Sequence, residues 1–348
     1  QEKCIPISLT GKDLIGISAT GSGKTLAFGS AIIEKTIPGR GLQALILAPT
    51  RELAEQISKT LKKFSKYYNL KIEEIYGGVS FSPQQSKLKK ADIVVATPGR
   101  ILDHISQRTI NLSKLRFLVL DEADRMLDMG FIDDVGKIIH HCPKERQTML
   151  FTATFSLDIE HISKKFLSNP AKIEVESYVD PTKLKQYYYD VEPYKKFSLL
   201  VHLLKEEKTG LVMVFCNTRM NVDFLDKNLR RIGLNSIAIH GGLSQNRRSF
   251  IMDQFHKNVV SVLICTDVAA RGLDIKNVSH IYNYDIPKNN IDYIHRIGRT
   301  ARAGKEGKAV SLVSSRDYEN FQKVNEDESL NISPLEIPNI QIIPIQRF

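Results

Sequence analysis

The sequence has little of what marks a secreted, zinc-binding or membrane-spanning protein. Its four cysteines are widely scattered, without a C-x-x-C pair or the paired histidine spacing that a zinc site needs. The apolar runs Leu42–Ala48 and Leu211–Cys216 are far too short to cross a bilayer, and no charged-then-apolar secretory leader opens the chain. We therefore expect a cytoplasmic or otherwise intracellular protein with neither structural disulfides nor zinc.

Size and charge narrow the class further. At 348 residues the chain exceeds what one hydrophobic core usually organises, so two domains are expected. Hydrophobic residues make up 42% and charged residues 25%, without a low-complexity tract, which is typical of a folded globular protein. The formal charge of +10 favours a polyanionic partner such as nucleic acid or acidic membrane, although a basic enzyme without such a partner would share it.

Short β-branched runs alternate with amphipathic stretches along the first half. Between the runs, Leu53, Ile57, Leu61 and Phe64 recur at helical spacing. Continuous apolar strands that alternate with helices predict an α/β fold, in which helices flank both faces of a parallel sheet. The predicted strands are 13–18, 43–48, 92–96, 115–120 and 147–151.

The same alternation restarts in the second half. A polar stretch that contains Pro181 separates the halves and predicts a linker. We therefore predict two tandem domains, residues 1–175 and 183–348, joined by a linker at about residues 176–182. Only the first domain carries a phosphate-binding loop, so one nucleotide per chain is expected. The predicted strands of the second half are 211–215, 236–239, 261–265, 278–282 and 308–313, with helices at 221–232 and 245–255 between them.

The segment after the first predicted strand has the pattern of a phosphate-binding loop. It opens a helix, and Gly21 and Gly23 permit a tight turn whose backbone N–H groups face phosphate oxygens. Lys24 is expected to reach the β- and γ-phosphates, and Thr25 to ligate Mg²⁺. A serine replaces the leading glycine of the usual pattern, so a plain turn is the alternative. The segment reads Ser18-Ala19-Thr20-Gly21-Ser22-Gly23-Lys24-Thr25.

A pair of acids directly follows the predicted strand that ends at Leu120. Asp121 is expected to hold Mg²⁺ through the coordination shell of the ion, and Glu122 to orient and deprotonate the attacking water. An acidic helix start favoured by the helix dipole is the alternative. The phosphate-binding loop in the same domain weakens that alternative and favours ATP hydrolysis.

These two motifs, with others in a consistent order, resemble those of the DEAD-box ATP-dependent RNA helicases, and the resemblance spans nearly the whole chain. Asp121-Glu122-Ala123-Asp124 spells the family name. The resemblance implies two RecA-like domains that use ATP and Mg²⁺ and bind single-stranded RNA through its backbone. Their ATP-driven closure is expected to unwind short duplexes or to remodel RNA-protein complexes. The segments that resemble the RNA-binding motifs are Pro49-Thr50-Arg51, Gly77-Gly78, Thr97-Pro98-Gly99-Arg100, Asn217-Thr218-Arg219, Gln245 with Arg248, and Thr266 with Gly272.

The resemblance also assigns residues to hydrolysis and coupling. Arg299 and Arg302 match the arginine fingers of the family, and their three-residue spacing predicts that they share one helix face. A finger supplied across a domain boundary accelerates hydrolysis by roughly 10³ to 10⁵, so hydrolysis should require domain closure. Further assignments by resemblance are ribose binding by Asp274 and coupling by Thr152-Ala153-Thr154, Asp124 and His295.

The first residue resembles the adenine-reading glutamine of the family's Q motif. Pro6 and Gly11-Lys12-Asp13 follow Gln1 at the expected places. The upstream aromatic is absent because the chain begins at Gln1 without methionine, so we expect residues to precede it in the complete protein. Three departures from the family are Thr152 for serine, Ser18 for alanine and Ala301 for glycine. The last matters only where the backbone needs a positive φ.

Rival interpretations stay open at this point. A DNA helicase or translocase of the wider superfamily shares the core motifs, and an ATP-gated RNA clamp would hydrolyse ATP slowly and unwind nothing. A P-loop kinase or GTPase explains only the first half, and each lone arginine fits a solvated surface charge equally well. We expect RNA as the partner, no membrane, and a monomer, with protein activators left open. The end, Ile337–Phe348, is predicted either to pack on the second domain or to serve as a docking tail.

Overall fold

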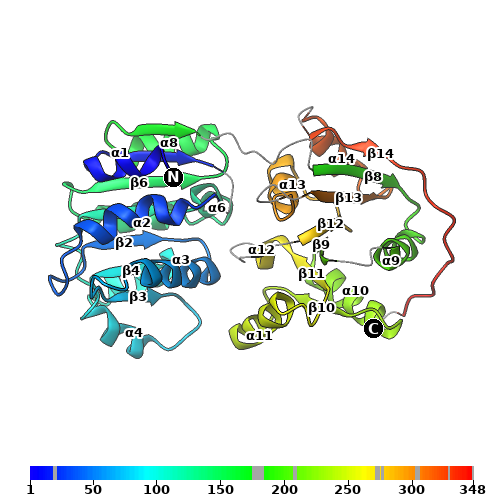
Figure 1. Ribbon diagram of the computed structural model, residues 1–348, viewed down its shortest axis with the longest axis horizontal. Helices are drawn as coiled ribbons and strands as arrows, with labels where there is room; N and C mark the ends of the chain where they lie inside the picture. The colour runs from blue at the N-terminus through cyan, green and yellow to red at the C-terminus, as the bar shows by residue number, and fades with distance from the viewer. Residues whose placement is uncertain are drawn as a thin grey trace. The chain divides into compact units, whose positions relative to one another are not determined.

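The computed structural model divides the chain into two compact units, Gln1–Ser177 and Tyr178–Phe348 (Figure 1). It describes residues 1–18, 22–174, 184–206, 210–270, 275, 278–301, 306–327 and 330–346. The predicted domain boundaries at 175 and 183, and the linker between them, lie outside these described residues and stay a prediction.

A seven-stranded parallel sheet forms the centre of the first unit. The strands lie in the order β3-β4-β2-β5-β6-β1-β7. Consecutive parallel strands need a crossover connection, so helices lie between them in the sequence and cover the faces of the sheet. The strands are β1 (Leu14–Ile17), β2 (Ala44–Leu47), β3 (Ile72–Ile75), β4 (Ile93–Ala96), β5 (Phe117–Leu120), β6 (Gln147–Thr152) and β7 (Ala171–Glu174).

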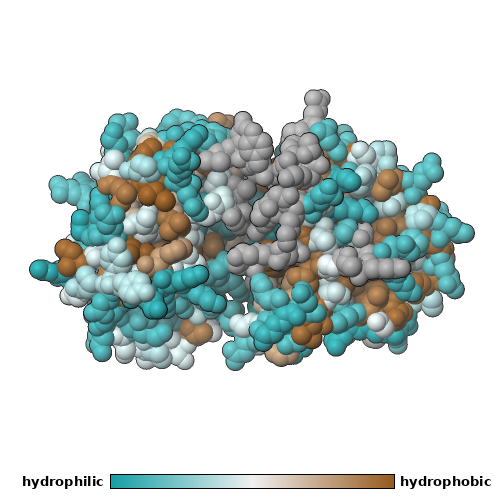
Figure 2. All heavy atoms as spheres, in the orientation of Figure 1, coloured by the Kyte–Doolittle hydropathy of each residue, from teal (hydrophilic) through white to brown (hydrophobic). Residues whose placement is uncertain are grey.

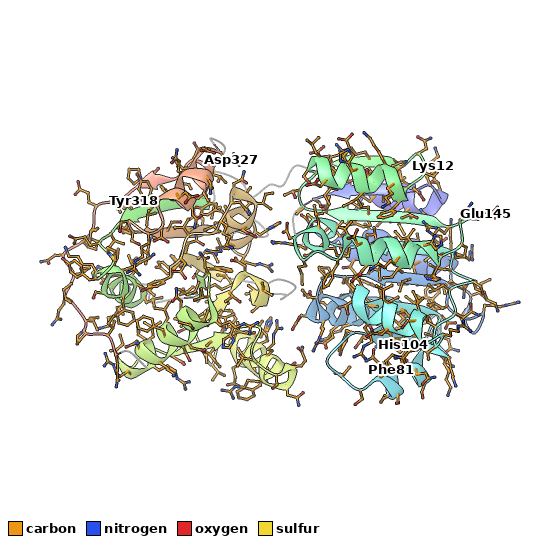
Figure 3. The ribbon with its side chains drawn as sticks, turned by 180° about the vertical axis from the view of Figure 1, so that it is seen from behind. Lys12, Phe81, His104, Glu145, Tyr318 and Asp327 are labelled. Atoms are coloured by element: carbon orange, nitrogen blue, oxygen red, sulfur yellow. The ribbon has the colours of Figure 1, made fainter. Side chains whose placement is uncertain are left out.

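Each face of this sheet has its own hydrophobic core. Ala44 and Ile46 enter one core, which α1 to α3 cover, whereas Leu45 and Leu47 enter the other, which α4 to α8 cover (Figures 1 and 3). The continuous apolar strands follow from this burial on both faces. The helices are α1 (Cys4–Thr10), α2 (Lys24–Lys35), α3 (Arg51–Phe64), α4 (Phe81–Leu88), α5 (Pro98–Ser106), α6 (Ala123–Asp128), α7 (Ile132–His140) and α8 (Leu157–Phe166).

The second unit repeats the same topology. Its parallel sheet has the order β10-β11-β9-β12-β13-β8-β14, so each strand has a counterpart in the first unit. The predicted α/β fold with two RecA-like parallel sheets is therefore confirmed. The elements are β8 (Leu184–Asp190), α9 (Lys196–Glu206), β9 (Leu211–Cys216), α10 (Arg219–Arg231), β10 (Ser236–Ile239), α11 (Gln245–His256), β11 (Val262–Thr266), α12 (Asp267–Ala270), β12 (Val278–Asn283), α13 (Asn290–Ile297), β13 (Gly307–Val313), α14 (Tyr318–Asn325) and β14 (Ser333–Pro334).

All ten predicted strands are present, with ends that differ by at most two residues. The strands β3, β7, β8 and β14 were not predicted. The first, Ile72–Ile75, exposes part of Glu73 and Glu74, and the second, Ala171–Glu174, exposes Lys172 and Glu174. Strands near a sheet edge bury fewer residues and so lack the continuous apolar run that identified the central ones.

The C-terminal segment packs on the second unit as an extended chain (red in Figure 1). Its Ile340 and Ile343 contact the core between the sheet and helices α9 and α10. Asn228, fully buried in α10, donates from its side chain to the Gln346 carbonyl at 3.1 Å and accepts from the Gln346 N–H at 2.9 Å. Of the two predicted roles for this end, the structure supports packing on the second domain.

Hydrophilic and apolar residues intermix on the visible face of each unit (Figure 2). Within the described residues, no helix combines the length and the apolar character needed to cross a membrane.

Candidate functional site

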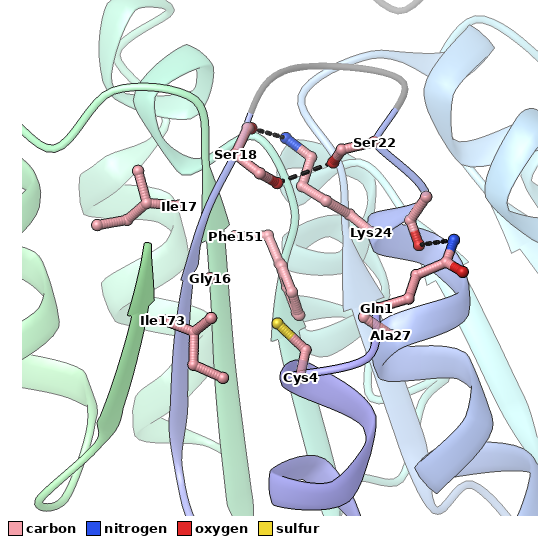
Figure 4. Close-up of a pocket in the computed structure, with 11 residues that line it drawn as sticks. Gln1, Cys4, Gly16, Ile17, Ser18, Ser22, Lys24, Ala27, Phe151 and Ile173 are labelled. Carbon is pink, nitrogen blue, oxygen red and sulfur yellow. Dashed lines mark hydrogen bonds between the residues drawn. The ribbon is translucent and has the colours of Figure 1, made fainter. Parts of the chain in front are cut away.

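The described part of the phosphate-binding loop joins β1 to α2 (Figure 4). Gly23 caps the helix with φ +85°, a left-handed conformation that favours glycine. The Lys24 ammonium donates to the Ser18 carbonyl at 3.1 Å, and the hydroxyls of Ser18 and Ser22 lie 2.8 Å apart. Lys24 thus reaches back across the loop from the first turn of α2. Ala19, Thr20 and Gly21 lie outside the described residues.

The Q-motif glutamine lies directly against this loop. Gln1 donates from its side-chain amide to the Gly23 carbonyl at 3.4 Å (Figure 4). A Cβ atom built on Gly23 would stand 1.9 Å from the same amide nitrogen, so no other residue fits there without displacing Gln1. Both residues line a pocket together with Cys4, Lys24 and Phe151. The structure therefore brings Gln1 and the phosphate-binding loop together, although they lie 22 residues apart.

The paired acids follow β5, as predicted. Asp121 is 3% exposed, and its N–H donates to the Leu47 carbonyl at 3.0 Å. Burial raises the pKa of the Asp121 carboxyl to about 6, whereas the nearby Lys24 ammonium lowers it and Glu122 raises it further. The ammonium of the loop and this carboxyl therefore belong to one buried site.

The backbone of Glu122 is strained. It has φ +53° and ψ +54°, in the left-handed region that costs a residue with a side chain roughly 1–2 kcal/mol. Glu122 is also 5% exposed and stands directly before α6. Strain of this kind persists where the surrounding structure imposes it, and it clusters at functional sites.

The last acid of the box holds the predicted coupling segment. One oxygen of Asp124 accepts from the N–H groups of Ala153 and Thr154, both at 3.1 Å, and from the Thr154 hydroxyl at 3.2 Å. Its other oxygen accepts from the Arg125 N–H at 3.0 Å. Thr152 donates its hydroxyl to the Thr154 carbonyl at 2.7 Å. A shift of this segment therefore disturbs hydrogen bonds to the acid box.

Several predicted RNA-binding residues of the first unit surround the turn after β3. The Arg51 guanidinium lies so close to Gly78 that a Cβ there would stand 2.2 Å from it. Arg100 donates two hydrogen bonds to the Val79 carbonyl, both at 3.1 Å, and lies over the Phe81 ring. That ring stacks on His104, with centroids 4.1 Å apart (Figure 3).

Threonines begin the two helices that carry these arginines. Thr50 caps α3 and accepts from the Leu53 N–H at 3.3 Å, and Thr97 stands before α5, in which Pro98 occupies the first turn. A Cβ at Gly99 would meet nothing within 4 Å. Pro49 and Thr50 are buried, whereas Arg51 and Arg100 are half-buried.

In the second unit, Arg296 hydrogen-bonds to several of the predicted motif segments, although no role was predicted for it from the sequence. It is 1% exposed and pairs with Asp267 through two contacts of 2.7 Å. It also donates to the side chains of Asn217 at 2.8 Å and Asn283 at 3.2 Å, and to the Asp285 carbonyl at 2.6 Å. Its position three residues after the buried Tyr293, on the apolar face of α13, was a signal for this role.

Other predicted residues of this unit lie at strand and helix ends. Thr218 caps α10 and accepts from the Asn221 N–H at 3.1 Å. Gln245 begins α11, Arg248 on the same helix donates to the Ala269 carbonyl at 3.3 Å, and the buried Thr266 ends β11. Gly272 and Asp274 lie outside the described residues.

The predicted helix face shared by the two finger arginines is wrong. Helix α13 ends at Ile297, so Arg299 lies in the turn that follows, with 5% exposure. Ala301 has φ +53°, which no helix can accommodate, and Arg302 lies outside the described residues. The substitution of alanine for the usual glycine thus falls at a position that does need a positive φ. His295 is half-buried on α13.

Mg²⁺ is implied by the family. The residues fit it, because a buried carboxyl on Asp121 and the hydroxyl of Thr25 in the first turn of α2 are the hard oxygen ligands that Mg²⁺ prefers. A nearby cation would also offset the cost of ionising a carboxyl whose pKa burial has raised.

Two RecA-like sheets, the first with a phosphate-binding loop beside a buried acid pair, define an ATP-dependent helicase of the two-domain kind. The family model of the DEAD/DEAH box helicases matches residues 1–162, and that of the helicase conserved C-terminal domain matches residues 195–304.

Relatives support the same class. The chain is 46% identical over 341 residues to the ATP-dependent RNA helicase CshA of Listeria monocytogenes, covering 97% of this chain and 66% of that protein. It is 42% identical over 343 residues to the DEAD-box ATP-dependent RNA helicase CshA of Geobacillus kaustophilus, covering 98% and 73%. Dbp5 of S. cerevisiae, bound to RNA and ADP BeF3, has a TM-score of 0.87 at 32% identity, covering 97% of this chain and 89% of that one.

The chain belongs to the DEAD-box ATP-dependent RNA helicases. The predicted family, fold and enzyme class are thereby confirmed. The chain spans 66% to 73% of the length of the two CshA relatives.

Proposed function

We propose that ATP with Mg²⁺ and a single RNA strand together close the two units, bending the strand so that a short duplex cannot stay paired. Hydrolysis then reopens the clamp. The observation that carries this proposal is the hydrogen-bonded junction of Asp124 with Ala153 and Thr154, which couples the acid box to a second segment. RNA-bound relatives such as Dbp5 support RNA as the partner.

The residues of the first unit have distinct proposed roles in hydrolysis. Lys24 binds the β- and γ-phosphates, and Gln1 reads adenine beside the loop. Thr25 and Asp121 hold Mg²⁺, which when bound neutralises charge on the phosphates. Glu122 orients and deprotonates the attacking water, and the strain in its backbone is consistent with a side chain held in one place.

The second unit supplies the proposed arginine fingers and further contacts. Arg299 and Arg302 stabilise the charge that spreads over the leaving γ-phosphoryl oxygens, Asp274 binds ribose, and His295 links the coupling segments. Because the fingers and the loop belong to different units, whatever favours closure should stimulate hydrolysis.

RNA contacts are proposed to fall on phosphates and sugars. Arg51, Arg100 and Arg219 supply the cations, and threonines and glycine N–H groups supply neutral donors, so binding is independent of sequence. We further propose that the protein acts as an intracellular monomer, since its substrates ATP and RNA occur inside cells, and that protein activators regulate closure.

ATP turnover with and without RNA tests the proposal. We expect RNA to stimulate turnover, Lys24→Ala to lose ATP binding, and Arg299→Ala to keep binding while losing hydrolysis. Equal stimulation by DNA of the same sequence would favour the DNA translocase, because only RNA offers the 2′-OH. Turnover in Arg299→Ala equal to that of the unchanged protein would overturn the arginine assignment.

A further inference from the structure

The two units share a local device as well as a topology. In the first, β2 leads through Thr50 into Arg51 at the start of α3, and in the second, β9 leads through Thr218 into Arg219 at the start of α10. The strand order makes β2 and β9 counterparts, and likewise β3 and β10. Each of the latter pair runs into a glycine doublet, Gly77-Gly78 or Gly241-Gly242.

Each glycine doublet receives the arginine of its own unit. A Cβ at Gly78 would stand 2.2 Å from the Arg51 guanidinium, and a Cβ at Gly241 would stand 3.3 Å from that of Arg219. Within the described residues, neither guanidinium lies within salt-bridge distance of a carboxylate. The Gly241-Gly242 doublet and Arg219 are exposed. Each unit therefore places a guanidinium beside a glycine turn. Because the glycines carry no side chains, the backbone of a bound nucleic-acid strand can approach this turn closely.

In each unit a pair of residues, here called the brace, brings the residue before the glycine doublet next to the helix that carries the arginine. In the first unit, Tyr76 precedes the doublet, and burial together with the nearby Glu55 carboxylate, four residues after Arg51, raises the pKa of its hydroxyl. In the second, His240 precedes the doublet and lies 3.1 Å from Asp223, four residues after Arg219. The braces differ in chemistry, yet they occupy equivalent positions and join the same two elements.

The second brace also holds the turn itself. His240 is 8% exposed, and its Nδ1 accepts from the Gly242 N–H at 3.2 Å. The ring proton therefore lies on Nε2 and points to the Asp223 carboxylate. A Cβ at Gly242 would stand 3.1 Å from the His240 ring, so the turn packs closely against the imidazole.

We propose that Asp223 and His240 are positioning residues that hold Gly241-Gly242 and Arg219 as a phosphate-binding turn for the RNA strand in the second unit. This turn is the counterpart of the one that Arg51 and Gly77-Gly78 form in the first. It contacts phosphate and sugar rather than base edges, so it adds affinity without sequence preference. The inference rests on the proposed RNA binding.

Binding of a fluorescent single-stranded RNA to the full chain, with a non-hydrolysable ATP analogue, tests this inference at several salt concentrations. We expect His240→Ala to weaken binding about fivefold, and Arg219→Gln to reduce the slope of log affinity against log salt by about 0.7, the loss of one phosphate contact to a single strand. Tyr76→Phe, which removes the brace of the first unit, should weaken binding similarly. Asp253→Asn, an exposed acid on α11, is the matched control and should bind as the unchanged protein does.

Two conservative variants separate positioning from folding. His240→Asn keeps an acceptor near the position of Nδ1, whereas His240→Gln keeps a donor near that of Nε2. We expect His240→Asn to retain most of the RNA affinity and His240→Gln to lose it, while thermal unfolding confirms that both fold. Equal binding by all His240 variants and the unchanged protein would overturn the inference and leave the proposed function standing. No RNA binding by the unchanged protein would overturn both.

Discussion

Replacing Asp121 by asparagine is expected to stabilise the protein in the absence of Mg²⁺. The carboxyl is buried, and its pKa rises from 3.8 to about 6. At 1.36 kcal/mol per pH unit, ionising it in the folded state costs about 3 kcal/mol more than in the unfolded chain. The free energy of unfolding of Asp121→Asn should therefore exceed that of the unchanged protein by up to about 3 kcal/mol at pH 7.5.

The pH dependence has a definite sign. A carboxyl whose folded pKa is raised binds its proton more tightly in the folded state, so its cost is full above pH 6 and vanishes below pH 3.8. The difference between the two proteins should shrink as the pH falls from 7 towards 4. Denaturant unfolding without Mg²⁺, at several pH values, measures it. In these experiments, the unfolding transition of the first unit is identified as the one that shifts when nucleotide is added.

A matched control lies three residues along the chain. The Asp124 carboxylate accepts four hydrogen bonds, so Asp124→Asn should destabilise the same unit, opposite in sign to Asp121→Asn. Mg²⁺ with nucleotide should stabilise the unchanged protein but not Asp121→Asn. The reasoning would be refuted if the Asp121→Asn protein were less stable than the unchanged one at pH 7.5. It would also be refuted if the difference between their free energies of unfolding did not change with pH.

Three further changes have expected outcomes. Gly23→Ala forces a side chain into a left-handed turn and against Gln1, so nucleotide affinity should fall at least tenfold in a fluorescent-ATP titration; unchanged affinity would contradict this packing. Thr154→Val removes one donor to Asp124 and should lower the free energy of unfolding by about 1 kcal/mol in denaturant, with a much smaller effect when Asp124→Asn is already present. Ala301→Gly relieves a positive φ and should raise the melting temperature of the second unit by a few degrees, which an unchanged or lower value would disprove.

The central strands and the acid box could be read from local pattern. Strands such as Phe117–Leu120 are buried on both faces and so appear as continuous apolar runs, and the acids that follow them stand where a parallel sheet presents its ligands. Edge strands such as Ala171–Glu174 lack this pattern, because solvent reaches part of their side chains. The role of Arg296 was not predicted for a related reason. A charged side chain is expected on the surface, yet carboxylate and amide groups from three other segments accept the hydrogen bonds of this guanidinium in the interior.

Local order along the chain was thus sufficient for the fold class, for the motifs and for the chemistry each residue type can perform. Contacts between distant segments required the folded chain. Only the packing of α1 on α2 places Gln1 at Gly23, and only the alignment of β10 beside α10 places His240 against Asp223. The backbone angles of Glu122 and Ala301 belong to the same group, because surrounding tertiary contacts, rather than the preferences of those residues, impose a positive φ.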